Sequence, residues 1–207
     1  MAQLAGHPSW QLAAADPCGL DEVGRGALAG PLVAAAVVLP PGFTHPLLRD
    51  SKLLSERQRE MIEPVIREEA LALQVASIQV DEIDARGVGW ANRMAFELLV
   101  GSVVAPEYLG DGNLRIRTSR PYRSVVGGDR LVPAISAASI VAKVFRDRLM
   151  RELHPQFFHY GWDRNKGYGS PHHLSAIRRH GLCPHHRRSF IHLEEPGLFD
   201  QAITTSA

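Results

Sequence analysis

The sequence predicts an α/β fold, in which a mixed central sheet is flanked by helices and the C-terminal third is helical. Three observations support this prediction. Short apolar runs rich in valine fall in the first two thirds of the chain, amphipathic stretches separate them, and the longest amphipathic stretch, residues 132–153, follows the last of them. Strands that alternate with helices and then give way to helices are typical of one domain whose helices pack on a sheet.

The first two strands are expected on either side of a glycine-rich turn. Residues 18–22 read as a short strand, and residues 24–31 (GRGALAGP) form the turn. Residues 32–39 (LVAAAVVL) are almost wholly apolar, as in a strand buried on both faces. We expect the two strands to pair antiparallel across the turn.

A helix is expected to begin after Ser55. Ser55 and Gln58 have the spacing of a capping box, in which each side chain satisfies a backbone N–H group of the other residue. Pro64 falls within the apolar stripe of this helix. Because proline removes a helical hydrogen bond and clashes with the preceding turn, it should kink or shorten the helix.

The middle of the chain is expected to alternate between strands and helices. Residues 71–80 read as a strand, and a helix starts at Asp81, although Gly87 and Gly89 weaken its first half. Two further short strands are expected at residues 103–109 and 124–126.

The C-terminal third is expected to be helical. Residues 132–153 form the longest helix, and residues 174–180 form a short one that Gly181 ends. Residues 143–190 hold ten lysines and arginines against three acidic residues, although the formal net charge of the whole chain is only +1. Such clustering is either a solvated positive face or a surface for a polyanion such as a nucleic acid.

The composition indicates one globular domain, since the 207 residues are 45% hydrophobic and 22% charged. We expect loose tails over residues 1–16 and 193–207 around a domain over residues 17–192. No run is long enough to cross a bilayer, and no secretory signal opens the chain. Only Cys18 and Cys183 are present, without metal-ligand spacing, which indicates the reducing cytoplasm.

Four acidic residues stand beside glycines at the expected strand ends: Asp21, Glu22, Asp111 and Asp129. For one aspartate alone, turn chemistry is the simpler explanation. As a set they offer hard oxygen ligands, which suit Mg²⁺ or Mn²⁺, and two such ions can clamp a phosphodiester. Adjacent strand residues point to opposite faces, so Asp21 and Glu22 can share a metal only where the strand ends or bends.

The glycine-rich turn admits a second interpretation as a nucleotide-binding loop. Its spacing does not match the dinucleotide-binding motif, because Ala29 occupies the place of the third glycine. The turn also lacks a Walker lysine and leads into a strand. We therefore favour a turn whose backbone N–H groups approach a sugar-phosphate chain.

The order of the motifs resembles a known family. Six blocks have the order and rough spacing of ribonuclease HII, the type 2 ribonuclease H: GLDEVGRG, RDSKLLSERQRE, GDGN, VVGGDRL, NKGYGSPHH and PHHRRSF. The resemblance runs from Cys18 to Phe190. It implies a ribonuclease H-like fold and an endonuclease that cuts the RNA strand of RNA/DNA hybrids. It also implies cleavage at single ribonucleotides embedded in duplex DNA, with 5′-phosphate and 3′-hydroxyl products.

The resemblance also implies roles for single residues. The four acids would hold two Mg²⁺ or Mn²⁺ ions, Gly24, Arg25 and Gly26 would read the 2′-hydroxyl, and Tyr168 would lie against the sugar at the RNA–DNA junction. An ordinary half-buried core tyrosine is the alternative for Tyr168.

Candidates for contacts with the phosphate backbone are Lys52, Lys143, Arg146 and Lys166. Arg187 and Arg188 are weaker candidates, because packing of the C-terminal segment against the sheet is an equally good explanation for them. The pairs His172–His173 and His185–His186 are interpreted as phosphate or surface groups.

Two other functions stay open on the sequence. A non-catalytic hybrid-binding module would keep the basic third but would not need four acids. The related ribonuclease HIII family usually carries an additional N-terminal domain, for which the segment before Asp21 leaves no room. We expect a monomer that binds RNA/DNA hybrid and ribonucleotide-containing duplex DNA, without a membrane or a recognisable protein-partner motif.

Overall fold

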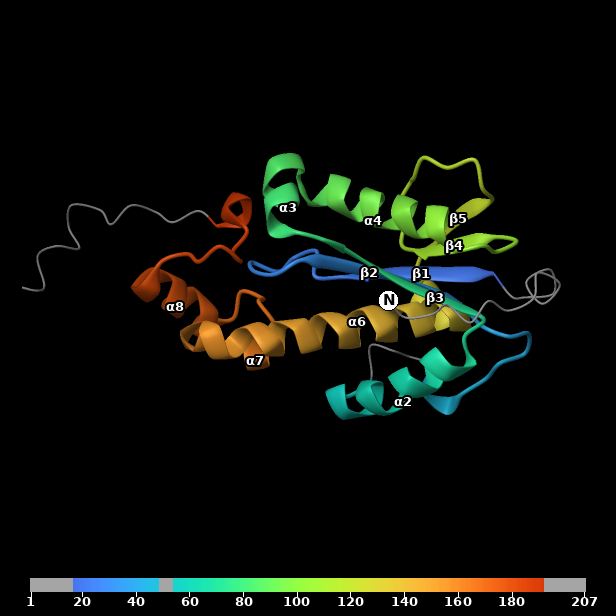
Figure 1. Cartoon of the computed structure of the whole chain (residues 1–207), viewed down its shortest axis with the longest axis horizontal. Helices are drawn as coiled ribbons and strands as arrows, with labels where there is room; N and C mark the ends of the chain where they lie inside the picture. Colours follow the sequence, from blue (N-terminus) through green and yellow to red (C-terminus); the bar gives the residue numbers. More distant parts are fainter. Residues whose placement is uncertain (1–16, 49–53, 192–207) are drawn as a thin grey trace, which may run out of the picture.

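A computed structural model describes residues 17–48 and 54–191, which form a five-stranded sheet with helices on both faces (Figure 1). The strand order is β3-β2-β1-β4-β5. β2 pairs antiparallel with β1 and β3, whereas β4 pairs parallel with β1 and β5, so the predicted mixed sheet is confirmed. The strands are β1 Cys18–Val23, β2 Leu32–Val38, β3 Ala72–Ile78, β4 Tyr108–Asp111 and β5 Tyr122–Val125.

Helices connect the strands and make up the C-terminal third of the described chain. The α-helices are α2 Glu56–Glu69, α3 Val80–Arg86, α4 Val88–Ser102, α5 Gly128–Leu131, α6 Pro133–Leu153, α7 Trp162–Asn165 and α8 Pro171–His180. Short 3-10 helices are η1 Pro46–Leu48, η2 His154–Gln156, η3 Phe158–Tyr160 and η4 Arg188–Phe190. The described residues contain no helix long and apolar enough to cross a membrane.

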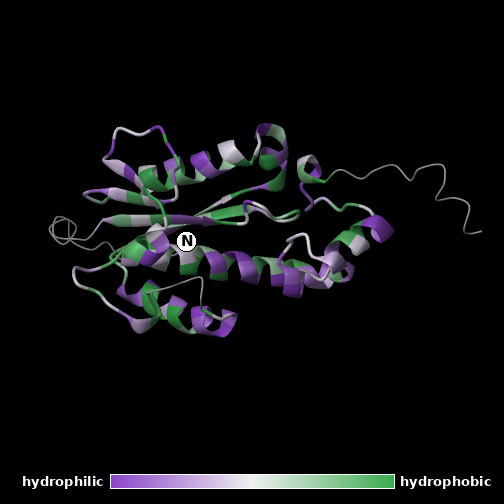
Figure 2. Ribbon diagram, turned by 180° about the vertical axis from the view of Figure 1, so that it is seen from behind, coloured by the Kyte–Doolittle hydropathy of each residue, from purple (hydrophilic) through white to green (hydrophobic). Residues whose placement is uncertain are grey.

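Strand β2 divides the core because its side chains are buried on both faces. Leu32 and Val38 belong to the cluster that packs under α4, whereas Val33 and Val37 belong to the cluster under α2 and α6. Figure 2 shows hydrophobic and hydrophilic residues alternating along α4 and α6, as expected of helices with one face on a sheet. Burial on both sides explains why residues 32–38 carry no polar residue.

Helix α2 begins as predicted but does not shorten at Pro64. Ser55 and Gln58 form the complete capping box. The helix continues unbroken to Glu69, so the expected shortening is wrong. Ile62 and Ile66 are buried on either side of the exposed Pro64, and this packing outweighs the one hydrogen bond that proline removes on the solvent side.

Two other boundaries differ from the sequence prediction. The helix expected from Asp81 is broken into α3 and α4, because Gly87 has a φ of 83°, which no helix accommodates. The strand expected over residues 103–109 exists only from Tyr108 onward. Val103 instead caps the end of α4, and Tyr108 donates its hydroxyl proton to the Val103 carbonyl group at 2.5 Å.

The C-terminal third packs around its own small core. Tyr160, Trp162 and Ile177 are buried there together with Met150 from the end of α6. Cys183 joins this core, and both it and Cys18 are buried free thiols. This small core connects the end of α6 to the glycine-rich turn between β1 and β2, since Leu28 and Ala29 both donate backbone hydrogen bonds to the Gly167 carbonyl group.

Candidate active site

Asp21 and Asp111 lie side by side because their strands are parallel neighbours. The register of β1 and β4 pairs Leu20 with Gly110, so each aspartate is the next residue along its strand. Asp111 is also the last residue of β4. The sheet therefore brings together two carboxyl groups that are 90 residues apart in the sequence.

Asp129 reaches the same region through the turn that follows β5. The backbone N–H of Gly128 donates to Asp111 Oδ1 at 2.7 Å, which fixes this turn against the end of β4. Asp129 is the next residue and is fully buried at the start of α5. A side chain at Gly128 would lie 2.6 Å from Ile135 Cδ1, so it would have to displace the end of the Ile135 side chain.

Glu22 belongs to the other face of the sheet. β1 continues to Val23 and stays paired with β2 there, so the strand neither ends nor loses its pairing at Asp21 and Glu22. Asp21 hydrogen-bonds Ser139 of α6, whereas Glu22 hydrogen-bonds Asn92 of α4. The two acids thus flank the strand, and the charge of Asp111 acts on both.

Burial and neighbouring charge make the carboxyl groups of Asp21 and Glu22 hard to ionise. Burial, followed by the charges of Glu22 and Asp111, raises the pKa of Asp21 to about 8, although hydrogen bonds from Ser139 and the Glu22 N–H oppose the shift. Burial also raises the pKa of Glu22, against the opposing charge of Arg25 at 3.5 Å. Negative charge is therefore unfavourable here unless a cation compensates it.

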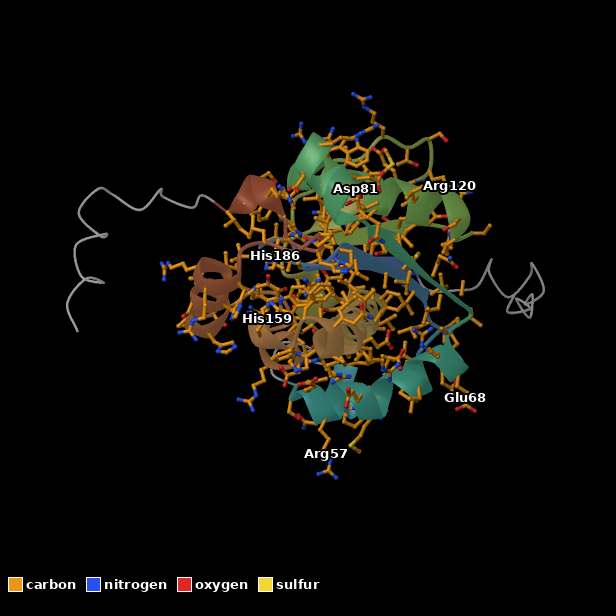
Figure 3. The ribbon with its side chains drawn as sticks, turned by 60° about the vertical axis from the view of Figure 1, so that its left-hand side comes forward. Arg57, Glu68, Asp81, Arg120, His159 and His186 are labelled. Atoms are coloured by element: carbon orange, nitrogen blue, oxygen red, sulfur yellow. The ribbon has the colours of Figure 1, made fainter. Side chains whose placement is uncertain are left out.

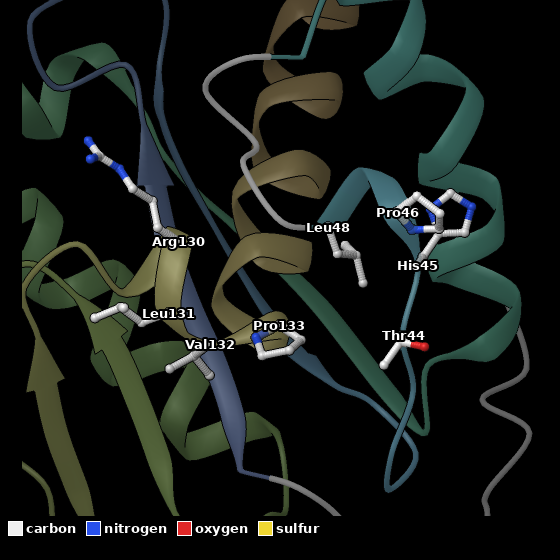
Figure 4. Close-up of a pocket in the computed structure, with 8 residues that line it drawn as sticks. All are labelled: Thr44, His45, Pro46, Leu48, Arg130, Leu131, Val132 and Pro133. Carbon is white, nitrogen blue, oxygen red and sulfur yellow. The ribbon is translucent and has the colours of Figure 1, made fainter.

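The acids do not form a closed ligand set in this structure. Within residues 17–48 and 54–191, no three histidine, cysteine, aspartate or glutamate side chains form a group that could hold a metal ion. The site instead presents carboxylate oxygens on both sides of one strand end. A pocket shown in Figure 4 contains none of the four acids in its lining, which consists of Thr44, His45, Pro46, Leu48 and residues 130–133.

The glycine-rich turn leads directly from Glu22 into β2. Gly24 has a φ of 90°, and a side chain there would lie 2.3 Å from Arg146 Nε, so the turn sits on this arginine. Arg25 and Gly26 are exposed. No heavy atom lies within 4 Å of the position that a Gly26 side chain would take. The turn therefore leaves open space beside the acids.

Tyr168 is half-buried and lies between two cations. Its ring centre is 5.3 Å from Arg146 Cζ and 5.9 Å from Lys143 Nζ. Lys143 also forms an ion pair with Asp147 at 2.7 Å. Tyr168 thus faces the middle of α6, where Arg146 supports the glycine-rich turn, and it is not part of the core of the C-terminal third.

Two of the predicted phosphate contacts are buried. Arg146 is fully buried and donates to three backbone carbonyl groups. Lys166 is nearly buried, and its ammonium group contacts the Asp163 carbonyl oxygen and Glu56. Both side chains face protein acceptors, so the interpretation as direct phosphate contacts is wrong for this conformation. Lys52 lies outside the described residues.

The prediction of surface groups is wrong for one histidine of each pair, His173 and His186. His173 and His186 are buried and lie with their Nε2 atoms 3.0 Å apart. Figure 3 labels His186. His186 Nδ1 accepts the N–H of Cys183, so its Nε2 carries the proton donated to His173. His173 Nδ1 then donates to the Tyr168 carbonyl group at 2.9 Å. Only His172 of the two pairs is exposed.

Two residues of the site were not found from the sequence. Ser139 and Asn92 hold Asp21 and Glu22 from opposite helices. Each lies on an element far from its partner in the sequence, and a polar residue within the apolar face of α4 or α6 is the only signal that marks it. Arg187, one of the weaker phosphate candidates, is fully buried below the glycine-rich turn, in line with the packing alternative.

Comparison with known proteins identifies relatives over most of the chain. The family model described as Ribonuclease HII matches residues 18–193. A protein named ribonuclease HII from Burkholderia pseudomallei (strain 668) is 51% identical over 180 residues, which cover 86% of this chain and 84% of that protein.

Solved structures share the fold at low sequence identity. Ribonuclease HII in its complex with PCNA from Archaeoglobus fulgidus matches with a TM-score of 0.74 at 23% identity, over 89% of this chain and 98% of that one. Bst-RNase HIII in complex with Mn²⁺ matches with a TM-score of 0.61 at 21% identity, over 87% of this chain and 69% of that one. These likenesses establish a ribonuclease H-like fold.

Proposed function

The chain belongs to the ribonuclease HII family, and from this premise we propose that it hydrolyses the RNA strand of RNA/DNA hybrids and cuts at single ribonucleotides in duplex DNA. Family membership makes it a nuclease with ribonuclease H activity. One observation carries the finer proposal: Asp21 and Asp111 lie side by side at the point where the glycine-rich turn leaves the sheet. Reacting groups and ribose-reading groups would then lie next to each other.

The residues present fit divalent cations. Asp21, Glu22, Asp111 and Asp129 offer only oxygen ligands, and a buried carboxyl group with a pKa near 8 is stabilised as a carboxylate by a cation. A relative of similar fold is known in complex with Mn²⁺, which supports this choice. When bound, two Mg²⁺ or Mn²⁺ ions would supply a water of lowered pKa and stabilise the leaving 3′-oxygen.

The chain's own residues set the positions of three of the four acids. Ser139 and the Glu22 N–H hold Asp21, the Gly128 N–H holds Asp111, and Asn92 and Arg25 hold Glu22. These hydrogen bonds leave the carboxylates few alternative orientations. The proposed role of this network is to keep the carboxyl oxygens in place while the substrate exchanges.

Ribonucleotide recognition is assigned to the turn and to Tyr168. A 2′-hydroxyl both donates and accepts hydrogen bonds, and it distinguishes RNA from DNA at a single position. The exposed backbone of Arg25 and Gly26 can meet it without an intervening side chain. Tyr168 offers a flat ring for the adjacent sugar, and Lys143 beside it offers a cation for the phosphate backbone.

A cleavage assay tests this function. A DNA duplex that carries one ribonucleotide is incubated with the protein in Mg²⁺, in Mn²⁺ and in chelator, beside an all-DNA duplex of the same sequence. We expect one metal-dependent cut at the ribonucleotide and none in the all-DNA duplex. Binding of the ribonucleotide duplex without cleavage in either metal would favour the non-catalytic binding module.

A further inference from the structure

Two buried arginines lie beneath the glycine-rich turn. Arg146 comes from α6 and Arg187 from the segment before η4, and neither has exposed surface. Among the described residues, neither forms an ion pair with a carboxylate. Burying two like charges without a counter-ion costs stability, and burial together with the charge of Arg146 lowers the pKa of Arg187 to about 10. Folding alone therefore does not favour this arrangement.

The two guanidinium groups donate to the backbone of the turn. Arg187 donates from Nε to the Gly30 carbonyl group at 2.9 Å and from Nη1 to the Arg25 carbonyl group at 3.0 Å. Arg146 donates to the carbonyl groups of Pro31 and Ala29, both at 2.9 Å. Four carbonyl groups of the turn thus point inward to one pair of side chains.

Arg146 also connects the turn to the loop that carries Tyr168. Its third hydrogen bond, from Nη1, reaches the Lys166 carbonyl group at 2.8 Å. Lys166 itself has a φ of 51°, so this carbonyl group is presented by an unusual backbone conformation. One guanidinium group therefore joins the glycine-rich turn to the Tyr168 loop, in addition to the backbone hydrogen bonds from Leu28 and Ala29 to Gly167.

Anchoring the Arg25 carbonyl group inward directs the next N–H group outward, whereas the N–H groups of residues 28–30 donate to carbonyl groups of the C-terminal third. In a trans peptide the C=O and the following N–H point in opposite directions, so the Gly26 N–H points away from Arg187, to which the Arg25 carbonyl group is bound. In the described part of the chain, neither the Arg25 nor the Gly26 N–H donates to a protein acceptor. The outer side of the turn therefore presents free N–H donors in open space.

We propose that Arg146 and Arg187 are positioning residues that hold these outward N–H groups in the orientation that distinguishes a ribonucleotide from a deoxyribonucleotide. The inference rests on the proposed function. Arginine is required at both positions because its planar fork donates two or three divergent hydrogen bonds, which a lysine ammonium group cannot match at these distances. Arg146 additionally fills the space that a side chain at position 24 would occupy.

The test compares binding to two duplexes without cleavage. Dissociation constants are measured in chelator for a DNA duplex with one ribonucleotide and for the same duplex in DNA alone. We expect Arg187→Lys to lower the preference for the ribonucleotide duplex about tenfold, the effect of about 1.4 kcal/mol, with little change in affinity for the DNA duplex. Arg188→Lys is the matched control, because Arg188 is the exposed neighbour, and it should keep the preference.

Two outcomes separate this inference from the proposed function. If the unmodified protein prefers and cuts the ribonucleotide duplex but Arg187→Lys and Arg146→Lys keep the full preference, the inference is wrong and the function stands. If the unmodified protein neither prefers nor cuts that duplex, the function itself fails.

If the arginine variants do not fold, a measurement on the unmodified protein tests the inference instead. The Nε–H groups of Arg146 and Arg187 should exchange slowly with solvent, and their NMR signals should shift more with the ribonucleotide duplex than with the DNA duplex. Rapid exchange, or equal shifts with both duplexes, would overturn the positioning role.

Discussion

Asp21 is subject to two opposing influences at the scale of single residues. Burial and the charges of Glu22 and Asp111 favour its protonated form, whereas Ser139 and the Glu22 N–H hold its carboxylate oxygens by hydrogen bonds. The hydrogen bonds orient this carboxyl group as an acceptor, but its surroundings disfavour the negative charge. A bound cation would therefore strongly stabilise its carboxylate form. The same argument gives a prediction in which activity and stability change in opposite directions.

We expect Asp21→Asn and Asp111→Asn to lower the cleavage rate at least about 100-fold, because loss of groups that only support metal ligands already costs 10–100-fold. In chelator, Asp21→Asn should melt at a higher temperature than the unmodified protein at pH 8, since it removes a buried carboxyl group that ionises unfavourably. Cleavage assays and thermal melts measure the two effects. Near-normal cleavage by either variant would remove that residue from the metal site.

The buried histidine pair predicts a loss of stability in mild acid. Burial, with the charge of His173, lowers the pKa of His186 to about 4, whereas an unfolded histidine titrates near 6.5. Protonation therefore favours the unfolded chain. The stability that the neutral ring contributes is complete above pH 6.5 and is lost as the pH falls from about 6.5 toward 4.

We expect the unmodified protein to lose about 1–3 kcal/mol more stability between pH 7.5 and 5 than His186→Asn does. The asparagine can still accept the Cys183 N–H but has no ring to protonate. Denaturant titrations at both pH values measure the difference. Parallel losses in the two proteins would show that the histidine pair titrates normally.

At the scale of elements, features that depend on a few neighbouring residues could be predicted from the sequence. Features that depend on contacts between distant residues could not. The capping box of α2, the buried β2 and the Gly181 end of α8 follow from local chemistry, and the structure confirms them. The start of β4 was not predicted because it depends on the hydrogen bond from Tyr108 to Val103. The start of α4 was not predicted because it depends on the positive φ of Gly87.

The features of the site also fall into those that the sequence predicts and those that depend on distant contacts. Glycine-flanked acids could be read from the sequence, and the parallel pairing of β1 and β4 places Asp21 beside Asp111. The burial of Arg146 and of His173 could not be predicted, because charged and titratable residues are mostly exposed. Their burial depends on carbonyl groups and rings contributed by distant segments.

At this scale, the proline within helix α2 leads to a prediction about stability. Pro64 lies within the helix on its exposed side, where the Glu60 carbonyl group lacks its usual N–H donor. We expect Pro64→Ala to stabilise the protein by up to about 3 kcal/mol and to raise the melting temperature by several degrees, without a change in cleavage rate. A melting temperature that stays the same or falls would indicate that the proline ring contributes packing that the structure does not explain.

At the scale of the whole molecule, the sheet and the C-terminal third meet at the glycine-rich turn. The sheet carries Asp21, Glu22 and Asp111, whereas the C-terminal third supplies Tyr168 and the buried Arg187. Backbone hydrogen bonds from Leu28 and Ala29 to Gly167 join the two parts. Chemistry and recognition would therefore be separable by mutation.

We expect Tyr168→Ala to lower kcat/KM for a single embedded ribonucleotide about tenfold, since contacts with an aromatic ring contribute about 1–3 kcal/mol and a sugar contact falls at the low end. A long RNA/DNA hybrid should be affected less, and the melting temperature should be preserved because the ring is half-buried. An equal loss on both substrates together with a large fall in melting temperature would assign Tyr168 to the core.

The central claim is that acids from both sides of β1 form a metal-dependent site for hydrolysis next to a ribose-reading turn. End analysis of the products from a duplex with one embedded ribonucleotide tests it most directly. The account predicts one cut at the ribonucleotide, 5′-phosphate and 3′-hydroxyl ends, and no product in chelator or with Asp111→Asn. Cleavage that persists in chelator, or products with a 2′,3′-cyclic phosphate, would contradict it.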